Sequence, residues 1–209
     1  MENEFPKIEN RKSKIKNQKG LASRHLIVET AYRLFLEKGY AGTSVRDISA
    51  AASLTMGGIY AHFASKEDIF VAVFEAYHPF FHMVPFLLEV EGDTLESLVE
   101  NTARRMLELL GSRQETLHLM FVEIVEFQGR HFAGKIETGF PEVMQIADRF
   151  GRFQGQLRPI PLPALLRSFI GLFFSFFMTG MLFPSRMGMG EEEIRQFSDI
   201  YLHGIMEHK

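Results

Sequence analysis

The sequence contains no cysteine, and this absence removes several classes of protein at once. Without thiols there is no disulfide framework, no thiolate zinc site and no cysteine nucleophile, which suits a reducing compartment. Residues 1–20 are polar and charged, and they lack the apolar core of a secretory signal. We therefore expect a cytoplasmic protein.

A membrane-spanning segment is not expected either. The longest apolar run, 169–183, has about 15 residues, whereas a helix needs roughly 20 to cross a bilayer. We interpret this run as a buried helix and expect no membrane partner.

No segment alternates apolar and polar residues as a strand does, and no internal repeat is visible. Apolar residues instead recur at helical spacing, and glycines and prolines interrupt the pattern. Three short helices are expected after Gly42, followed by helices near 93–110, 113–128, 140–154, 162–183 and 191–207. The fold class is therefore expected to be all-α.

Charge is distributed unevenly along the chain. Residues 1–70 hold 11 Lys and Arg against 8 Asp and Glu, and the remainder holds 12 against 18. Residues 1–20 in particular are basic and lack apolar periodicity, so we expect a flexible basic arm. A basic front suggests a polyanionic partner, although a solvated charged tail explains the asymmetry equally well.

Residues 42–70 contain three closely spaced helix starts. Ser44 precedes Asp47 by three residues, Ser65 precedes Asp68 in the same way, and Thr55 supplies a third capping hydroxyl. Two short helices joined by a tight turn form a helix-turn-helix, in which the start of the second helix lies nearest the bases of DNA.

Residue types at these positions suit DNA binding. Adjacent glycines allow close approach of the backbone to a duplex, hydroxyls and a lysine suit phosphates, and Tyr60 and His62 offer polar tips. The alternative for Tyr60 and His62 is a half-buried position in a small core. The candidate DNA-binding residues are Thr43, Ser44, Thr55, Met56, Gly57, Gly58, Tyr60, His62 and Lys66.

The composite pattern resembles the DNA-binding signature of the TetR family of bacterial transcriptional regulators. It comprises Gly39-Tyr40, Thr43 to Ile48, and Gly57-x-Ile59-Tyr60-x-His62-Phe63-x-Ser65-Lys66-Glu67, within roughly residues 24–75. The resemblance implies a ligand-controlled repressor with an N-terminal helix-turn-helix and a C-terminal helical domain. Its domains are then a basic arm (1–20), a DNA-binding domain (21–75), and an effector-binding and dimerisation domain (76–209).

Two residues depart from the family pattern. Ser53 stands where a turn glycine is common, and serine fits there if its backbone avoids a positive φ or tolerates the cost. Met56 stands where a phosphate-binding lysine is common, so no phosphate contact is assigned to it.

The C-terminal part is rich in phenylalanine and methionine, which suit a loosely specified apolar ligand. Plain core packing is the alternative for each residue. The candidate ligand-binding residues are Met83, Phe86, Met106, Met120, Phe121, Phe127, Phe140 and Met144.

Polar residues among these helices do not indicate a metal or a cofactor. Only His78 and His82 share the spacing of one helix face, and Pro79 lies between them, so no metal site is expected. His118 and His131 are interpreted as solvated or singly hydrogen-bonded. Glu123 and Glu126 either hold a polar ligand group or face water, and we favour water.

The last two helices are apolar nearly all round, which one small subunit cannot easily bury. A four-helix interface with a second copy is therefore expected, as the resemblance also implies, and a two-fold dimer would read a palindromic site. The candidate interface residues are Leu166, Phe169, Phe173, Phe177, Phe197, Ile200 and Tyr201.

Two other functions are compatible with an all-α chain. An all-α enzyme has no visible nucleophile–base pair, metal set or phosphate loop to support it. A DNA-binding regulator without a ligand would use the same helix-turn-helix, but it would lack an apolar cavity of several hundred Å³, the usual size of a ligand site.

Overall fold

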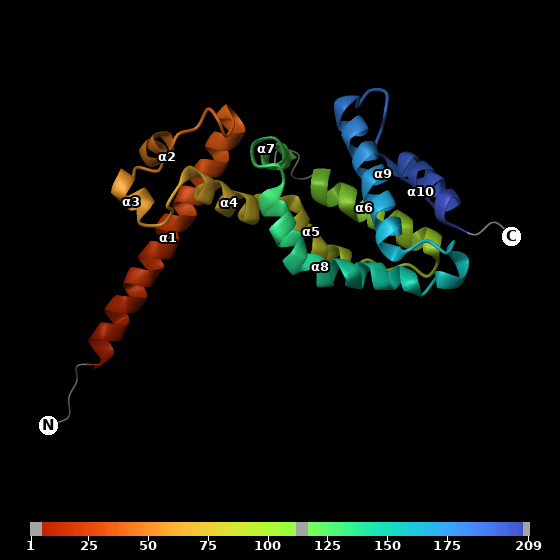
Figure 1. The fold of residues 1–209 in the computed structure, drawn as a ribbon, viewed down its shortest axis with the longest axis horizontal. Helices are drawn as coiled ribbons and strands as arrows, with labels where there is room; N and C mark the ends of the chain where they lie inside the picture. Colours follow the sequence, from red (N-terminus) through yellow and green to blue (C-terminus); the bar gives the residue numbers. More distant parts are fainter. Residues whose placement is uncertain (1–5, 112–116, 207–209) are drawn as a thin grey trace. The chain divides into compact units, whose positions relative to one another are not determined.

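A computed structural model describes residues 6–111 and 117–206, and this part of the chain is helical, without a β-strand (Figure 1). The all-α fold expected from the sequence is confirmed. The helices divide into two units: one takes in Met1–His78 with Glu115–His131, and the other takes in Pro79–Gln114 with Phe132–Lys209.

The first unit begins with α1 (Pro6–Lys38), which packs against α4 (Lys66–Tyr77) and α2 (Val45–Ala51). Gly39 follows α1 with a φ of +74°, the left-handed conformation that ends many helices. Since α1 starts at Pro6, most of the segment expected to be a flexible arm is helical.

Each short helix starts at the expected cap. Ser44 and Asp47 form a reciprocal capping box at α2, Thr55 accepts from the Gly58 amide at α3 (Met56–Tyr60), and Ser65 accepts from the Asp68 amide at α4. These three caps are confirmed, because a side-chain oxygen accepting an otherwise unpaired amide depends only on residues three apart.

A further helix, α7 (Leu117–Phe127), belongs to the first unit rather than to the second. The Phe127 ring lies 4.8 Å from that of Phe70 and 5.0 Å from that of Tyr40, which explains the association. The unit therefore includes residues beyond the expected range 21–75.

The second unit is built on α6 (Leu95–Gly111), which packs against α5 (Pro79–Leu87) and α10 (Glu191–Ile205). α10 also packs against α9 (Leu162–Leu182). The rings of Phe169 and Phe197 meet edge-on at 5.5 Å between these two helices.

A proline separates α4 from α5, and one expected break is absent. α4 ends at Tyr77, because the residue before Pro79 is pushed out of the helical conformation, and α5 then starts with Pro79 and contains Pro85. Residues 129–139 were expected to break the helix, but α8 spans Arg130–Gly151 and is followed by the short helix η2 (Gln154–Gln156).

α9 also differs from the expectation that it is too short for a membrane. Its 21 residues make it long and apolar enough, by length and composition alone, to cross one. A single such helix is weak evidence, because a core helix passes the same test.

Candidate nucleic-acid interface and apolar cavity

The helix-turn-helix is held together by local hydrogen bonds. The Asp47 carboxylate accepts from the Ser44 amide at 2.8 Å and from its hydroxyl at 2.5 Å. These bonds hold the pKa of Asp47 below its usual value, so the cap is ionised at neutral pH. In the turn, the Ser49 hydroxyl donates to the Leu54 carbonyl at 2.6 Å.

Ser53 occupies the turn in a strained conformation. Its φ is +53°, the left-handed region that favours glycine. The structure thus answers the question raised by the sequence: the serine does not avoid the positive φ but adopts it at a cost.

The exposed surface of α3 is the part that fits a partner. Thr55, Gly57 and Tyr60 are exposed, with Tyr60 at 52% of its surface, while Ile59 is fully buried and fixes the helix. A methyl group built on Gly57 would come no nearer than 4.0 Å to the Thr55 hydroxyl. Internal packing therefore does not require this glycine, whereas an external surface approaching the backbone would.

The remaining residues expected on this surface are partly covered. Ser44 is exposed, whereas Met56, Gly58 and His62 are half-buried. Thr43 is buried, and its hydroxyl shares its hydrogen between the carbonyls of Leu34 and Gly39 at 3.1 and 2.9 Å.

Lys66 has a different role from the one its residue type suggested. Its ammonium group donates to the carbonyl of Tyr40 at 2.9 Å and to that of Thr43 at 3.0 Å, and lies 4.1 Å from the centre of the Tyr40 ring. These two hydrogen bonds from the Lys66 ammonium tie α4 to the turn before α2. The structure therefore corrects the sequence interpretation that placed Lys66 at a DNA phosphate. It also corrects the interpretation that placed Thr43, which is buried, at the DNA surface.

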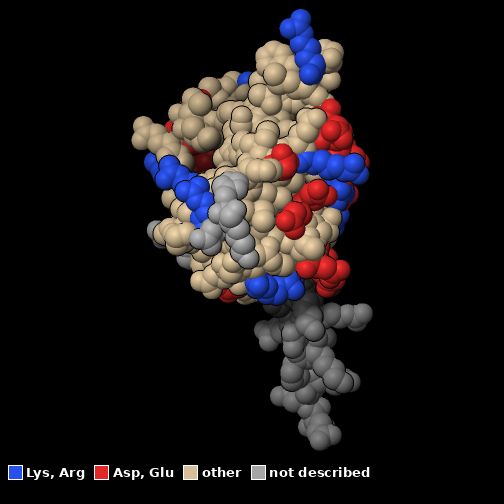
Figure 2. All heavy atoms as spheres, turned by 90° about the vertical axis from the view of Figure 1, so that its right-hand side faces the viewer, with Lys and Arg blue, Asp and Glu red and all other residues tan. Residues whose placement is uncertain are grey.

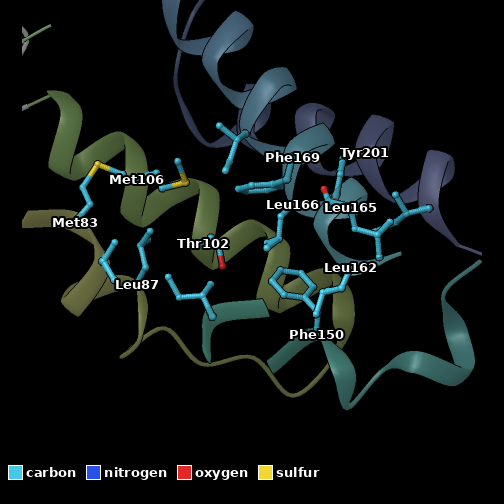
Figure 3. A pocket seen from close by; sticks show the side chains of 14 residues that line it. Met83, Leu87, Thr102, Met106, Phe150, Leu162, Leu165, Leu166, Phe169 and Tyr201 are labelled. Carbon is cyan, nitrogen blue, oxygen red and sulfur yellow. The ribbon is translucent and has the colours of Figure 1, made fainter. Parts of the chain in front are cut away.

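The second unit contains an apolar cavity of about 100 Å³, lined by α5, α6, α8, α9 and α10. Figure 3 shows side chains from these helices around it, with Met83 and Met106 on one side and Phe169 and Tyr201 on another. The two hydroxyls in its wall are already used: Thr102 donates to Leu98 at 2.7 Å, and Tyr201 donates to Leu165 at 2.9 Å. The cavity thus offers a ligand almost no polar contact.

Of the residues expected to bind a ligand, Met83 and Met106 line this cavity. Phe86 and Phe121 are exposed, and Phe127 is buried in the first unit, so the structure does not bring them to the cavity. Met120 and Met144 are half-buried away from the described lining, and the side chain of Phe140 lies outside the described residues. The sequence missed Phe150 and Ile146, whose contribution depends on where α8 packs.

Most residues expected at a subunit interface are instead buried within one chain. The group consists of Phe169, Phe173, Phe177, Phe197 and Tyr201. Leu166 is half-buried, and Ile200 is 63% exposed. Packing of α9 on α10 accounts for the buried rings, while Phe174 and Ile170, the latter also in the cavity wall, remain partly exposed.

The histidines and glutamates also correct the sequence interpretation. Glu123 does not face water: it is 1% exposed and lies 2.9 Å from Nδ1 of His131. His131 is not singly bonded, because its Nε2 lies 3.1 Å from Oε1 of Glu67. No group of three metal-ligating side chains occurs among the described residues.

Comparison with known proteins agrees with this geometry. Residues 27–73 match the family model for bacterial regulatory proteins of the tetR family. Over 44 residues the chain is 50% identical to the HTH-type transcriptional repressor DhaR of Mycobacterium sp. (strain GP1), a match covering 21% of this chain and 22% of DhaR. The similarity in sequence therefore spans about a fifth of that relative.

Solved structures extend the likeness to the whole fold. A TetR family transcription regulator from Marinobacter aquaeolei VT8 superposes with a TM-score of 0.65 at 18% identity, over 92% of this chain and 100% of that one. SmeT, solved as a complex with triclosan, gives a TM-score of 0.63 at 22% identity, over 89% and 92%. These likenesses concern the fold alone. Residues 27–73 of this chain thus match the DNA-binding domain of the tetR family of bacterial regulatory proteins, and its described helices share the fold of TetR family transcription regulators.

Proposed function

We propose that the protein is a cytoplasmic transcriptional repressor that binds a palindromic operator as a homodimer and is released by a small apolar or amphiphilic effector. The observation that carries the DNA-binding part is the exposed start of α3, with Thr55, Gly57 and Tyr60 outward and Ile59 buried. In a helix-turn-helix this end of the second helix reads base edges in the major groove.

Dimerisation is supported by the apolar side chains that one chain leaves uncovered on α9 and α10. Ile170 and Phe174 on α9 and Ile200 on α10 are all exposed. On the side drawn in Figure 2, uncharged residues form a broad area with most charged side chains toward its edges. A two-fold dimer would cover such a surface and place two copies of α3 about one DNA turn apart.

An effector is supported by the cavity of the second unit, whose apolar wall suits a small uncharged molecule. SmeT, which shares the fold, forms a complex with triclosan. Release of DNA would follow only if the effector binds the DNA-incompetent arrangement more tightly than the competent one.

The size of the cavity favours a second candidate. About 100 Å³ is well below the roughly 300–1,000 Å³ of a typical ligand site. A DNA-binding regulator without an effector would need no larger cavity. Neither proposal includes a membrane contact.

Selection of duplexes from a random-sequence library by the full-length protein tests the DNA-binding part. We expect enriched sites with two-fold symmetric half-sites, weak enrichment with Tyr60→Ala, and wild-type sites with Tyr60→Phe, which keeps the ring. Enrichment of no common sequence by the wild type would contradict the proposal.

Sedimentation of the full-length chain tests the dimer. Ile200→Glu places a charge on the proposed interface and should yield monomers, whereas Leu21→Glu, at an equally exposed position of 63% on α1, should leave the dimer intact. Dimers of unchanged stability in Ile200→Glu would exclude this face.

The effector is tested with triclosan as the probe, by melting temperature and by release of the selected duplex. Ile146→Trp fills the cavity and should reduce both effects together, while Phe121→Trp, at an exposed position, should reduce neither. Stabilisation without any release of DNA would favour the second candidate.

A further inference from the structure

The first turns of α4 and α8 and the end of α7 meet at a histidine held between two carboxylates. Nδ1 of His131 lies 2.9 Å from Oε2 of Glu123, and Nε2 lies 3.1 Å from Oε1 of Glu67. A neutral imidazole has one N–H and donates once, so only the doubly protonated ring donates to both. We infer that His131 is a proton-dependent positioning residue for the helix-turn-helix, an inference that rests on the proposed DNA-binding function.

Glu67, His131 and Glu123 together form a bridge, and its end at Glu123 is enclosed by protein. Glu123 is 1% exposed and also accepts the backbone N–H of His131 at 2.8 Å. The imidazole meets the Phe127 ring edge-on at 4.8 Å, and the Phe70 ring lies 6.4 Å away. In such surroundings a charged ring is attracted to a carboxylate more strongly than it would be in water.

The side toward Glu67 is more open and carries other charges. Arg130 donates to the same Glu67 oxygen, and the ammonium of Lys66 is next along α4. Burial raises the pKa of the Tyr40 phenol, and the nearby charges of Glu67 and then Glu126 raise it further. Loss of one ring proton can remove one of the two donors to this Glu67 oxygen, and it leaves that of Arg130.

Glu67 is connected to the start of α2 through its neighbour in the chain. Lys66 holds the carbonyls of Tyr40 and Thr43, and Thr43 directly precedes the α2 cap Ser44. The bond from His131 to Glu67 helps to fix the first turn of α4 and, through Lys66, this turn. Without that bond Glu67 keeps the Arg130 contact, but α2 and the α3 that follows lose one of the contacts that fix them.

The direction of the pH effect follows from this arrangement. In this inference the DNA-competent arrangement holds the doubly protonated ring, so affinity for DNA falls as rising pH removes that proton. One linked proton changes the binding constant by at most about tenfold per pH unit. Because the inference assigns His131 no contact with DNA, the salt dependence of binding should not change with its substitution.

The test uses the full-length protein and the duplex that it selects most strongly from a random library, titrated from pH 6 to pH 8.5 at several salt concentrations. We expect wild-type affinity to fall by about fivefold to tenfold over this range. His131→Gln and Glu67→Gln should lose most of this fall without a change in salt slope. Glu67→Gln lies at the open end of the bridge and serves if His131→Gln does not fold.

Three controls separate this effect from others. Arg130→Gln removes the other donor to Glu67 but leaves the His131 ring, so the pH dependence of DNA binding should remain. His203→Gln removes a histidine that lies 3.2 Å from Asp199 in the second unit, and should behave as the wild type. His62 lies at the proposed DNA surface. If His62→Gln reduces the fall of DNA affinity with pH, it should therefore also change the salt slope of binding.

Parallel pH profiles for the wild type, His131→Gln and Glu67→Gln would overturn the inference while DNA binding itself stands. A wild-type protein that selects no duplex would instead overturn the proposed function, and this inference with it.

Discussion

Replacing Lys66 by methionine separates a structural lysine from a phosphate-binding one. Methionine keeps most of the side-chain stem but removes the ammonium, which donates at 2.9 and 3.0 Å to two backbone carbonyls. The variant also loses the contact of the ammonium with the Tyr40 ring at 4.1 Å. The change therefore removes the link between α4 and the turn before α2.

The expected loss of stability follows from these contacts. A hydrogen bond from a charged group contributes about 1.5–3 kcal/mol, and the two bonds here share one half-buried ammonium that solvent partly screens. We expect Lys66→Met to lower the free energy of unfolding by about 2 kcal/mol, measured by urea titration of the circular dichroism signal. Arg46→Met, at an exposed position on α2, should change it by less than about 0.5 kcal/mol.

DNA binding supplies the second measurement. In a plot of the logarithm of the binding constant against the logarithm of the salt concentration, each phosphate contact steepens the slope by about 0.9. Since the Lys66 ammonium binds carbonyls, the slope for Lys66→Met should equal that of the wild type. Unchanged stability together with a salt slope reduced by about one would show that Lys66 contacts a DNA phosphate rather than stabilising the fold.

Three further predictions concern backbone strain, packing and the basic arm. Ser53→Gly relieves a φ of +53° and should raise the free energy of unfolding by about 1 kcal/mol in urea; a loss would show that the serine side chain stabilises the turn. Gly92→Ala places a Cβ 2.4 Å from the Leu98 amide nitrogen, so we expect a loss of about 2 kcal/mol or more by thermal unfolding, and a wild-type melting temperature would contradict this packing. Removing residues 1–17, which include five Lys and Arg, should weaken binding to the selected duplex and reduce its salt slope; unchanged values would assign the arm no contact with DNA.

The features predicted correctly from sequence are those that depend on neighbouring residues. Ser44 with Asp47, Thr55, and Ser65 with Asp68 each cap a helix as expected, because the bonds span three residues. The helical character of the whole chain follows from periodicity in the same local way.

The features that were missed depend on distant residues. Lys66 finds its carbonyls 23 and 26 residues earlier, and Glu67 meets His131 across 64 residues. Phe127 has the composition of a cavity residue, but it packs on Tyr40 and Phe70. No periodicity along the chain encodes these pairs, because they depend on how helices pack.

The proposed function depends on α3 reading a specific DNA sequence. The most direct test is titration of the full-length protein with its selected duplex and with a scrambled duplex of equal length and composition, at one salt concentration. We expect the protein to bind the selected duplex at least about 1,000-fold more tightly than the scrambled one. Tyr60→Ala should reduce this preference while binding the scrambled duplex as the wild type does. Equal affinity of the wild-type protein for both duplexes would show that α3 does not read a specific sequence.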